Sequence, residues 1–311
     1  MKNKHPHAAV VLVLGLAMAG LHLADLLLWS EADTGFAAAG SVWLRYIPWL
    51  AAFALPYLPA RRAATQPAGL QDTNKALGVC MALAGAALLA SGVAAGNTAR
   101  YAILYPEVLS GSCPVWAAWA DLLLPIFAGA WLLNYAVRAF SGFGLRRQRL
   151  GSSLLAGAVP LVFLWRLIWR FQFAPASLCR MPCTLRVLSA AAALLLAVVL
   201  IKIFCLCRVC PAGMTLYAAG TGAFLLCTGL ELPQTLFEAA RGMLTLPDLL
   251  TGIGIGLFGL CGLVCAWEAC GKENGISKKI TPLAGGEKSP SGHRCRSAAS
   301  PVRGTGRACE A

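Results

Sequence analysis

The sequence contains few charged residues. Only 13% of its 311 residues are Asp, Glu, Lys or Arg, whereas 58% are hydrophobic. A soluble domain carries about 25% charged residues, because its surface faces water. A chain with so few charges could not cover such a surface, but a chain solvated by lipid does not need to. The composition therefore excludes an ordinary soluble domain and favours an integral membrane protein.

The short motifs that specify a reaction or a nucleotide are also missing. The sequence has no Gly-Lys-Ser/Thr phosphate loop, no Gly-x-Ser-x-Gly elbow and no His-Glu-x-x-His zinc motif. Gly254, Gly256 and Gly259 have the spacing of a dinucleotide fingerprint, but that motif requires a preceding strand, and these glycines lie inside a long apolar run. Gly252 and Gly256, with Gly259 on the same side, predict instead a smooth helix face for close packing. No catalytic residue and no cofactor is therefore predicted, and an enzyme is the less favoured class.

Apolar stretches long enough to cross hydrocarbon as helices recur along the chain. Spanning takes about 20 apolar residues, and only helices or closed barrels satisfy the backbone in lipid. No alternating ten-residue barrel pattern is present. We predict an all-α polytopic bundle over residues 1–270 and a disordered basic tail over 271–311. About eight spans are expected, at 8–29, 42–58, 76–95, 115–137, 153–168, 185–204, 212–230 and 249–267.

The formal net charge of +13 is distributed in short basic patches between the apolar runs and in the tail. This distribution predicts the orientation of a membrane protein rather than a nucleic-acid partner, because basic loops stay in the cytoplasm. It places both ends of the chain inside. One outer connection departs from the rule, since Arg166, Arg170, Arg180 and Arg186 lie on or near it.

Ionisable residues within the apolar stretches are the main functional lead, because burying a charge in lipid is costly. In the predicted topology these residues all occupy the outer part of the membrane, where they could line one polar pocket. An anionic ligand or proton site is one interpretation, and structural ion pairing is the other. The candidate ligand-binding residues are Asp25, Arg45, Asp121, Arg166, Arg170 and Glu231.

Two local patterns refine this hypothesis. His22 and Asp25 stand three residues apart on one helix face and form a candidate proton relay. Trp165 with Trp169, and Arg166 with Arg170, form two adjacent stripes with four-residue spacing. These stripes are typical of an interfacial aromatic belt, and two guanidinium groups stacked by indoles could also bind a carboxylate or phosphate.

The cysteines do not form a metal-binding pattern. Only Cys207-x-x-Cys210 has the spacing of a zinc half-site, and no second pair accompanies it. No metal site is therefore predicted. On the outer side, Cys113, Cys179 and Cys183 could supply one disulfide, whose pairing the sequence leaves open.

Three functions remain in view for a multi-pass protein of a bacterial plasma membrane. The first is a permease or binding protein for a small anionic solute. The second is a non-enzymatic scaffold that docks other membrane helices through its glycine faces. The third is an intramembrane enzyme acting on lipid, with His22 and Asp25 as an acid–base pair. The expected partners are membrane lipid, a small anionic solute and other membrane helices, with no nucleic acid.

Overall fold

The fold was analysed in a computed structural model. It describes residues 6–31, 34–38, 40–55, 57, 70, 73–105, 115–142, 156–173, 179–205 and 213–270, without the side chains of 6–8, 170–173 and 204–205. These residues all belong to one compact unit. The predicted basic tail, 271–311, lies outside the described residues.

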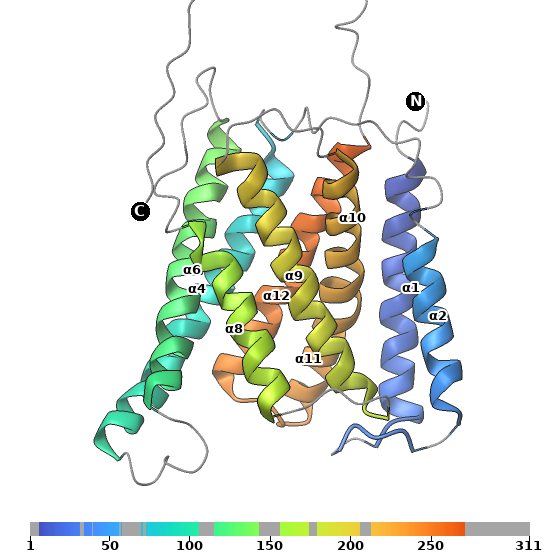
Figure 1. The fold of residues 1–311 in the computed structure, drawn as a ribbon, viewed down its shortest axis with the longest axis horizontal. Helices are drawn as coiled ribbons and strands as arrows, with labels where there is room; N and C mark the ends of the chain where they lie inside the picture. Colours follow the sequence, from blue (N-terminus) through green and yellow to red (C-terminus); the bar gives the residue numbers. More distant parts are fainter. Residues whose placement is uncertain are drawn as a thin grey trace, which may run out of the picture. The chain divides into compact units, whose positions relative to one another are not determined.

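Helices make up the regular structure of the described residues, apart from isolated bridge residues such as the pair Ser30 and Ala37 (Figure 1). The prediction of an all-α fold is therefore confirmed. The helices are α1 (Pro6–Leu28), α2 (Val42–Ala54), α4 (Lys75–Leu104), α6 (Val115–Ser141), α8 (Ala158–Phe173), α9 (Met181–Cys205), the continuous segment α10 (Gly213–Ala223), η2 (Phe224–Glu231) and α11 (Leu232–Ala240), and α12 (Leu246–Ala269).

Six of the helical segments in the described part of the chain are long and apolar enough to cross a membrane, so the predicted number of eight is corrected to six. The two shorter helices are α2, with 13 residues, and α8, with 16. At about 1.5 Å per residue they reach only about 20 and 24 Å, short of a hydrocarbon layer of about 30 Å. Both helices are shorter than the apolar runs from which they were predicted. Helix α2 ends shortly before Pro56, and α8 begins after Gly157.

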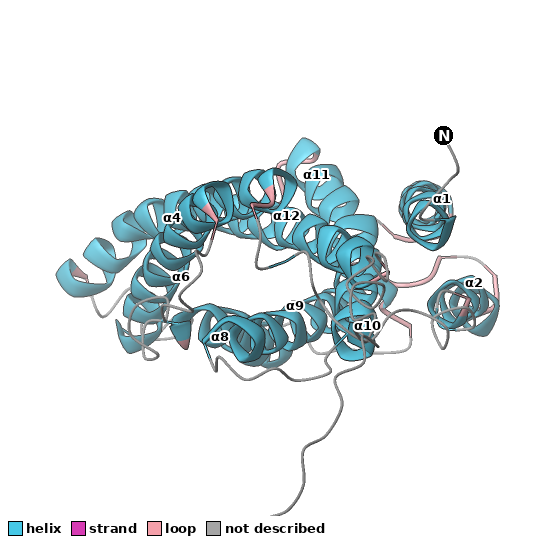
Figure 2. Cartoon of the chain, turned by 90° about the horizontal axis from the view of Figure 1, so that it is seen from above, coloured by secondary structure: helices cyan, strands magenta, loops and turns pink. Residues whose placement is uncertain are grey.

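Helix α12 contacts several of the other long helices. This helix contacts α4, α10 and η2, while α6 lies along α4 and α8 packs between α6 and α9 (Figure 2). The first two helices lie at one side of this arrangement: α1 contacts η2 and α11, and α2 contacts α1. Beyond the end of α2, the Tyr57 hydroxyl donates a hydrogen bond of 3.1 Å to the Ala218 carbonyl of α10.

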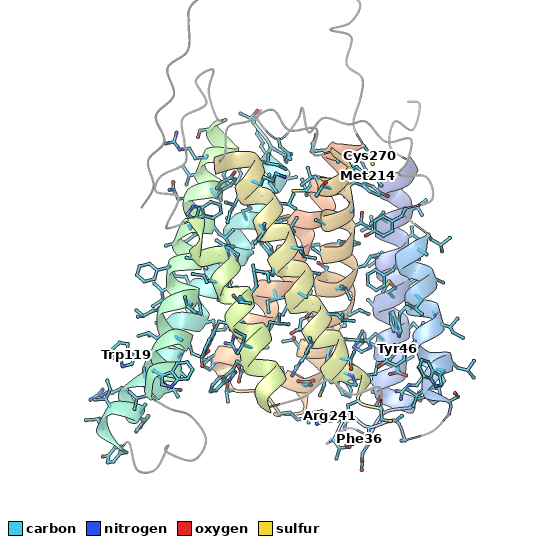
Figure 3. The ribbon with its side chains drawn as sticks, viewed as in Figure 1. Phe36, Tyr46, Trp119, Met214, Arg241 and Cys270 are labelled. Atoms are coloured by element: carbon cyan, nitrogen blue, oxygen red, sulfur yellow. The ribbon has the colours of Figure 1, made fainter. Side chains whose placement is uncertain are left out.

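Two ends of the bundle can be distinguished. Met214 and Cys270 lie at one end, where α1 begins, and Phe36 and Arg241 lie at the other (Figure 3). We call these the Cys270 end and the Arg241 end. At the Cys270 end, Asn74 caps α4 through its side chain and donates to Glu268 of α12 at 3.2 Å.

Pairs of glycines allow two pairs of helices to approach closely. A Cβ atom on Gly220 of α10 would lie 2.5 Å from the Gly262 carbonyl oxygen of α12. On the other side of α12, a Cβ on Gly129 of α6 would lie 2.6 Å from the Gly85 carbonyl oxygen of α4. No other residue fits at these contacts, where small residues bring backbones together as they do in membrane helix pairs.

The segment η2 is a π-helix of eight residues between two α-helical segments. At its end the Leu232 N–H donates to the Cys227 carbonyl, five residues earlier. Pro233 follows directly, and proline has no N–H for the residue four positions earlier and would clash with that carbonyl in an α-helix. The wider turn accommodates the proline ring without ending the helix, and π-helical turns often occur near functional sites.

Candidate functional site

An ion pair joins the first two helices near the Arg241 end. The Arg45 Nε and Nη2 atoms donate to the two carboxylate oxygens of Asp25, each at 2.6 Å. Nη2 also donates to the Ser30 hydroxyl. Both charged side chains are at least nine-tenths buried. Two parallel hydrogen bonds of this kind are the strongest geometry available to an arginine and a carboxylate.

His22 lies one turn before Asp25 but bonds to a different helix. Its Nε2 atom is 3.3 Å from the Gln234 Oε1 atom of α11, and Gln234 Nε2 donates to Glu238 at 2.9 Å. Because the Gln234 amide nitrogen is the donor to the carboxylate, its oxygen is the acceptor, so His22 carries a proton on Nε2. Nδ1 of His22 is buried and has no hydrogen-bond partner in the described part of the chain.

The polar chain continues from α11 to α9. Glu238 accepts a hydrogen bond from Arg186, and Glu231 at the end of η2 accepts one of 2.8 Å from the Ser189 hydroxyl. Glu231 also interacts electrostatically with Arg186. Buried carboxylates in lipid need such partners, since an uncompensated charge would be expelled or neutralised.

A cavity of about 240 Å³ lies beside this chain at the Arg241 end. Residues from the connection between α1 and α2, from the start of α9 and from α11 line it. The polar groups in its wall are Ser30, Glu31, Thr34, Arg180, Arg186, Gln234 and Glu238. Arg186 forms an ion pair with Glu238 and also interacts with Glu231 behind the wall. The remaining charged groups in the wall are Arg180 and Glu31, and Glu31 is exposed.

Arg180 has no carboxylate within ion-pairing distance among the described residues. Its Nε donates to the Thr34 carbonyl at 3.0 Å, and its guanidinium lies 5.3 Å from the centre of the Phe36 ring. These contacts fix the plane of the guanidinium and leave the terminal nitrogens without a described partner. An arginine held in this way presents a fork of donors suited to a carboxylate or phosphate.

A second polar group lies between α4, α6, α8 and α12. Arg166 donates to Asp248 at 2.9 Å and to the Thr251 hydroxyl at 2.8 Å. Ser91 of α4 bonds to the same threonine hydroxyl. Arg166 is 5% exposed, so an anion could reach it only by displacing these partners.

Asp121 belongs to this second group of helices. It accepts a hydrogen bond of 2.8 Å from the Trp165 indole, and Trp165 stacks on Trp169 with 5.4 Å between ring centres. The stacking confirms that the two tryptophans form one stripe of α8. The Arg170 side chain lies outside the described residues.

The residues predicted to share one pocket therefore lie in separate groups. Asp25 and Arg45 meet each other, and Glu231 lies in the α9–α11 chain. Arg166 and Asp121 contact other partners in the second group. The predicted relay residues do not bond to each other, because His22 reaches Gln234 and Asp25 reaches Arg45. Several residues of the two groups were not predicted as site residues: Arg180, Arg186, Ser189, Gln234, Glu238, Asp248 and Thr251. The excess of arginine just before and at the start of α9 was the available signal for the first two.

The glycine face of α12 packs inside the bundle. A Cβ on Gly256 would lie 2.7 Å from Leu232 Cβ, and one on Gly252 would lie 2.5 Å from the Thr235 hydroxyl. The prediction that these glycines serve close helix packing is confirmed. The packing partners are helices of the same chain, so this face is not available to dock another protein.

Cysteines near the cavity provide chemical probes. Cys179 is exposed and Cys183 is half-buried in the cavity wall, and neither forms a disulfide with another cysteine among the described residues. Cys113, Cys207 and Cys210 lie outside the described residues. At the Cys270 end, burial raises the pKa of the Cys270 thiol, so less of it is in the reactive thiolate form at neutral pH.

No protein-family model, curated protein or solved structure matches this chain. The fold identifies it as a multi-pass helical membrane protein.

Proposed function

We propose that this protein is a permease or membrane-embedded binding protein for a small solute that carries a carboxylate or phosphate group. The cavity at the Arg241 end is the proposed binding site. The observation that supports this proposal most directly concerns Arg180. Its guanidinium forms part of the cavity wall and has no carboxylate partner among the described residues.

The size and chemistry of the cavity are consistent with a small polar ligand. Its volume of about 240 Å³ is slightly below the range of about 300–1,000 Å³ typical of sites for drug-sized ligands. Gln234 and the Arg186–Glu238 pair supply a fixed polar wall. The partly apolar remainder includes Leu26, Pro182, Phe237 and Met243, which would exclude water around a bound anion.

We also infer that the Arg241 end faces outward and the Cys270 end faces the cytoplasm. The basic patches that the sequence assigns to the inside precede or follow helix ends at the Cys270 end, such as Lys75 at the start of α4 and Arg138 near the end of α6. Acidic groups gather at the Arg241 end, where Glu31, Glu238 and Asp248 lie. The connections that the sequence assigns to the inside, together with the tail, hold most of the lysines and arginines, as the positive-inside rule requires, whereas Arg45, Arg180 and Arg241 at the Arg241 end depart from it. The solute would then enter from outside.

Protection of Cys183 from alkylation tests the proposal. Purified protein in detergent is treated with a maleimide in the presence of inorganic phosphate, acetate or succinate, and each cysteine is followed by peptide mass spectrometry. We expect at least one of these anions to slow the modification of Cys183 several-fold, while exposed Cys179, outside the cavity wall, reacts at an unchanged rate.

Two variants make this test specific. In Arg180→Gln the protection should disappear, because the anion-binding fork is removed. Arg241→Gln is the matched control, since Arg241 stacks on Phe237 at 4.7 Å but does not line the cavity. If none of the anions protects wild-type Cys183, or if Arg180→Gln is protected equally well, the proposed site is wrong. Uptake into proteoliposomes then distinguishes a permease from a binding protein.

A further inference from the structure

A second cavity lies between α1 and α2 and is independent of the proposed solute site. Its volume is about 330 Å³. Leu21, Leu44, Pro48 and Trp49 form apolar walls, and the Asp25–Arg45 ion pair lies among them. Leu44 is 66% exposed, so this wall of the groove is open to the surroundings of the protein. In a membrane, the medium on that side is lipid.

The polar part of this groove retains unused hydrogen-bonding capacity. Arg45 uses Nε and Nη2 for Asp25 and Ser30, and its Nη1 atom has no described partner. Pro48 has no N–H, so the Leu44 carbonyl one turn earlier lacks the donor that a regular helix would supply. Unpaired polar groups of this kind are costly in hydrocarbon. A ligand oxygen at this depth would accept a hydrogen bond from Arg45 Nη1, and a hydroxyl or ammonium group would donate one to the Leu44 carbonyl.

The depth of the ion pair matches the polar boundary of a bilayer. Asp25 precedes the end of α1 by three residues, and Arg45 follows the start of α2 by three. At about 1.5 Å per residue, both lie about 5 Å inside their helix ends. The groove wall at Trp49 is a further turn deeper. The groove therefore has polar groups near the helix ends and apolar walls deeper in the membrane. A phospholipid has the same sequence of polar and apolar parts, from its phosphate and glycerol to its acyl chains.

We propose that this α1–α2 groove binds one glycerophospholipid, with its phosphate accepting hydrogen bonds from Arg45 and an acyl chain lying between Leu21, Leu44 and Trp49. The groove of about 330 Å³ has apolar side chains on the walls below the ion pair, and this shape suits an extended acyl chain. Asp25 already neutralises Arg45, so the site recognises the phosphate common to these lipids rather than net negative charge.

Photo-crosslinking tests the lipid site in full-length protein reconstituted into phosphatidylethanolamine–phosphatidylglycerol vesicles. The vesicles carry a trace of phosphatidylethanolamine with a diazirine in its acyl chain, and labelled residues are mapped by mass spectrometry. We expect labelling concentrated on the walls of the groove. A diacylglycerol probe with the same chains but no phosphate should label these walls several-fold less.

A matched pair of substitutions on α2 completes the test. Leu44→Trp fills the groove and should reduce wall labelling several-fold, whereas Leu50→Trp should leave it unchanged. Both leucines are well exposed, at 66% and 68%, but only Leu44 lines the groove. The proposal is overturned if the labelling is as strong around Leu50 as in the groove, since that pattern indicates only surrounding bilayer lipid. It is also overturned if Leu44→Trp has no effect, or if a second copy of the chain is crosslinked there instead.

Discussion

Asp25 and Arg45 illustrate how a charge is kept within a membrane helix. They are 20 residues apart in the sequence, on different helices, and share two hydrogen bonds in a nearly closed environment. Asp25→Ala would leave the arginine buried without its counter-charge. We expect this change to lower the free energy of unfolding by about 3 kcal/mol, in the range found when one partner of a buried pair is removed. Unfolding in mixed micelles, followed by circular dichroism, would measure the loss.

The double variant Asp25→Ala/Arg45→Leu is the control for this prediction. Removing both charges eliminates the uncompensated ion, so the double variant should be more stable than Asp25→Ala alone. The single variant Arg45→Leu is measured as well. If the decreases in the free energy of unfolding of Asp25→Ala and Arg45→Leu simply add in the double variant, the ion pair does not contribute to stability.

At the scale of single residues, the sequence identified the charged residues that are unusual in membrane helices, but not the residues that they contact. A charged side chain in lipid has a high free energy, and this argument selected Asp25, Arg45, Arg166 and Glu231 as candidates. All four side chains are buried or nearly buried in the structure. Their partners depend on how the helices rotate about their axes, which a single sequence does not specify. Thus Asp25 could be paired with His22 by spacing alone, whereas in the structure His22 turns toward Gln234 on a helix more than 200 residues later.

At the scale of helices, apolar runs located the long elements well and their ends poorly. The predicted span at 212–230 ended where Glu231 and Pro233 interrupt the hydrophobic pattern. The helix instead continues through η2 and α11 to Ala240. A charged residue followed by a proline normally predicts the end of a membrane-spanning helix. Here the Ser189 hydroxyl donates a hydrogen bond to the Glu231 carboxylate, and the π-helical turn accommodates Pro233. Neither compensation is visible in the local sequence.

The glycine face of α12 leads to a stability prediction. Gly256→Ala should lower the free energy of unfolding by about 1–3 kcal/mol, because the new methyl group would overlap Leu232 of the neighbouring segment. Thermal unfolding in detergent would measure the change.

Gly20→Ala in α1 is the matched control for that substitution. A Cβ atom there would meet nothing within 4 Å. Alanine also has the higher helix propensity, so Gly20→Ala should leave stability unchanged or raise it slightly. Equal effects of the two substitutions would show that helix propensity rather than close packing determines the result.

At the scale of the whole molecule, the two kinds of basic residue are distributed differently. The described lysines, Lys75 and Lys202, lie on helix segments at the Cys270 end, and the remaining lysines lie in the amino-terminal segment and the tail. The Arg241 end carries arginine alone among the described residues, including Arg45, Arg180 and Arg241. The proposed orientation would therefore place every lysine in the cytoplasm.

An amine-reactive reagent that does not cross membranes tests this orientation. In intact cells we expect no labelling of the protein, and in permeabilised cells we expect strong labelling. Arg241→Lys introduces one amine at the opposite end and should make the protein reactive from outside. Labelling of wild-type protein in intact cells, or no gain with Arg241→Lys, would show that the inferred orientation is reversed.

The glycine contacts on the two sides of α12 also have a mechanical consequence. Where the carbonyl of one helix fills the place of a side chain on the next, neither helix can roll about its axis without driving backbone into backbone. We therefore expect the α4–α6 pair and the α10–α12 pair each to move as a rigid unit. The α1–α2 connection supplies Ser30, Glu31, Thr34 and Gly35 to the wall of the 240 Å³ cavity, and the other walls come from α9 and α11. Any widening or narrowing of that cavity would therefore come from these segments, which lie outside the two glycine-paired units.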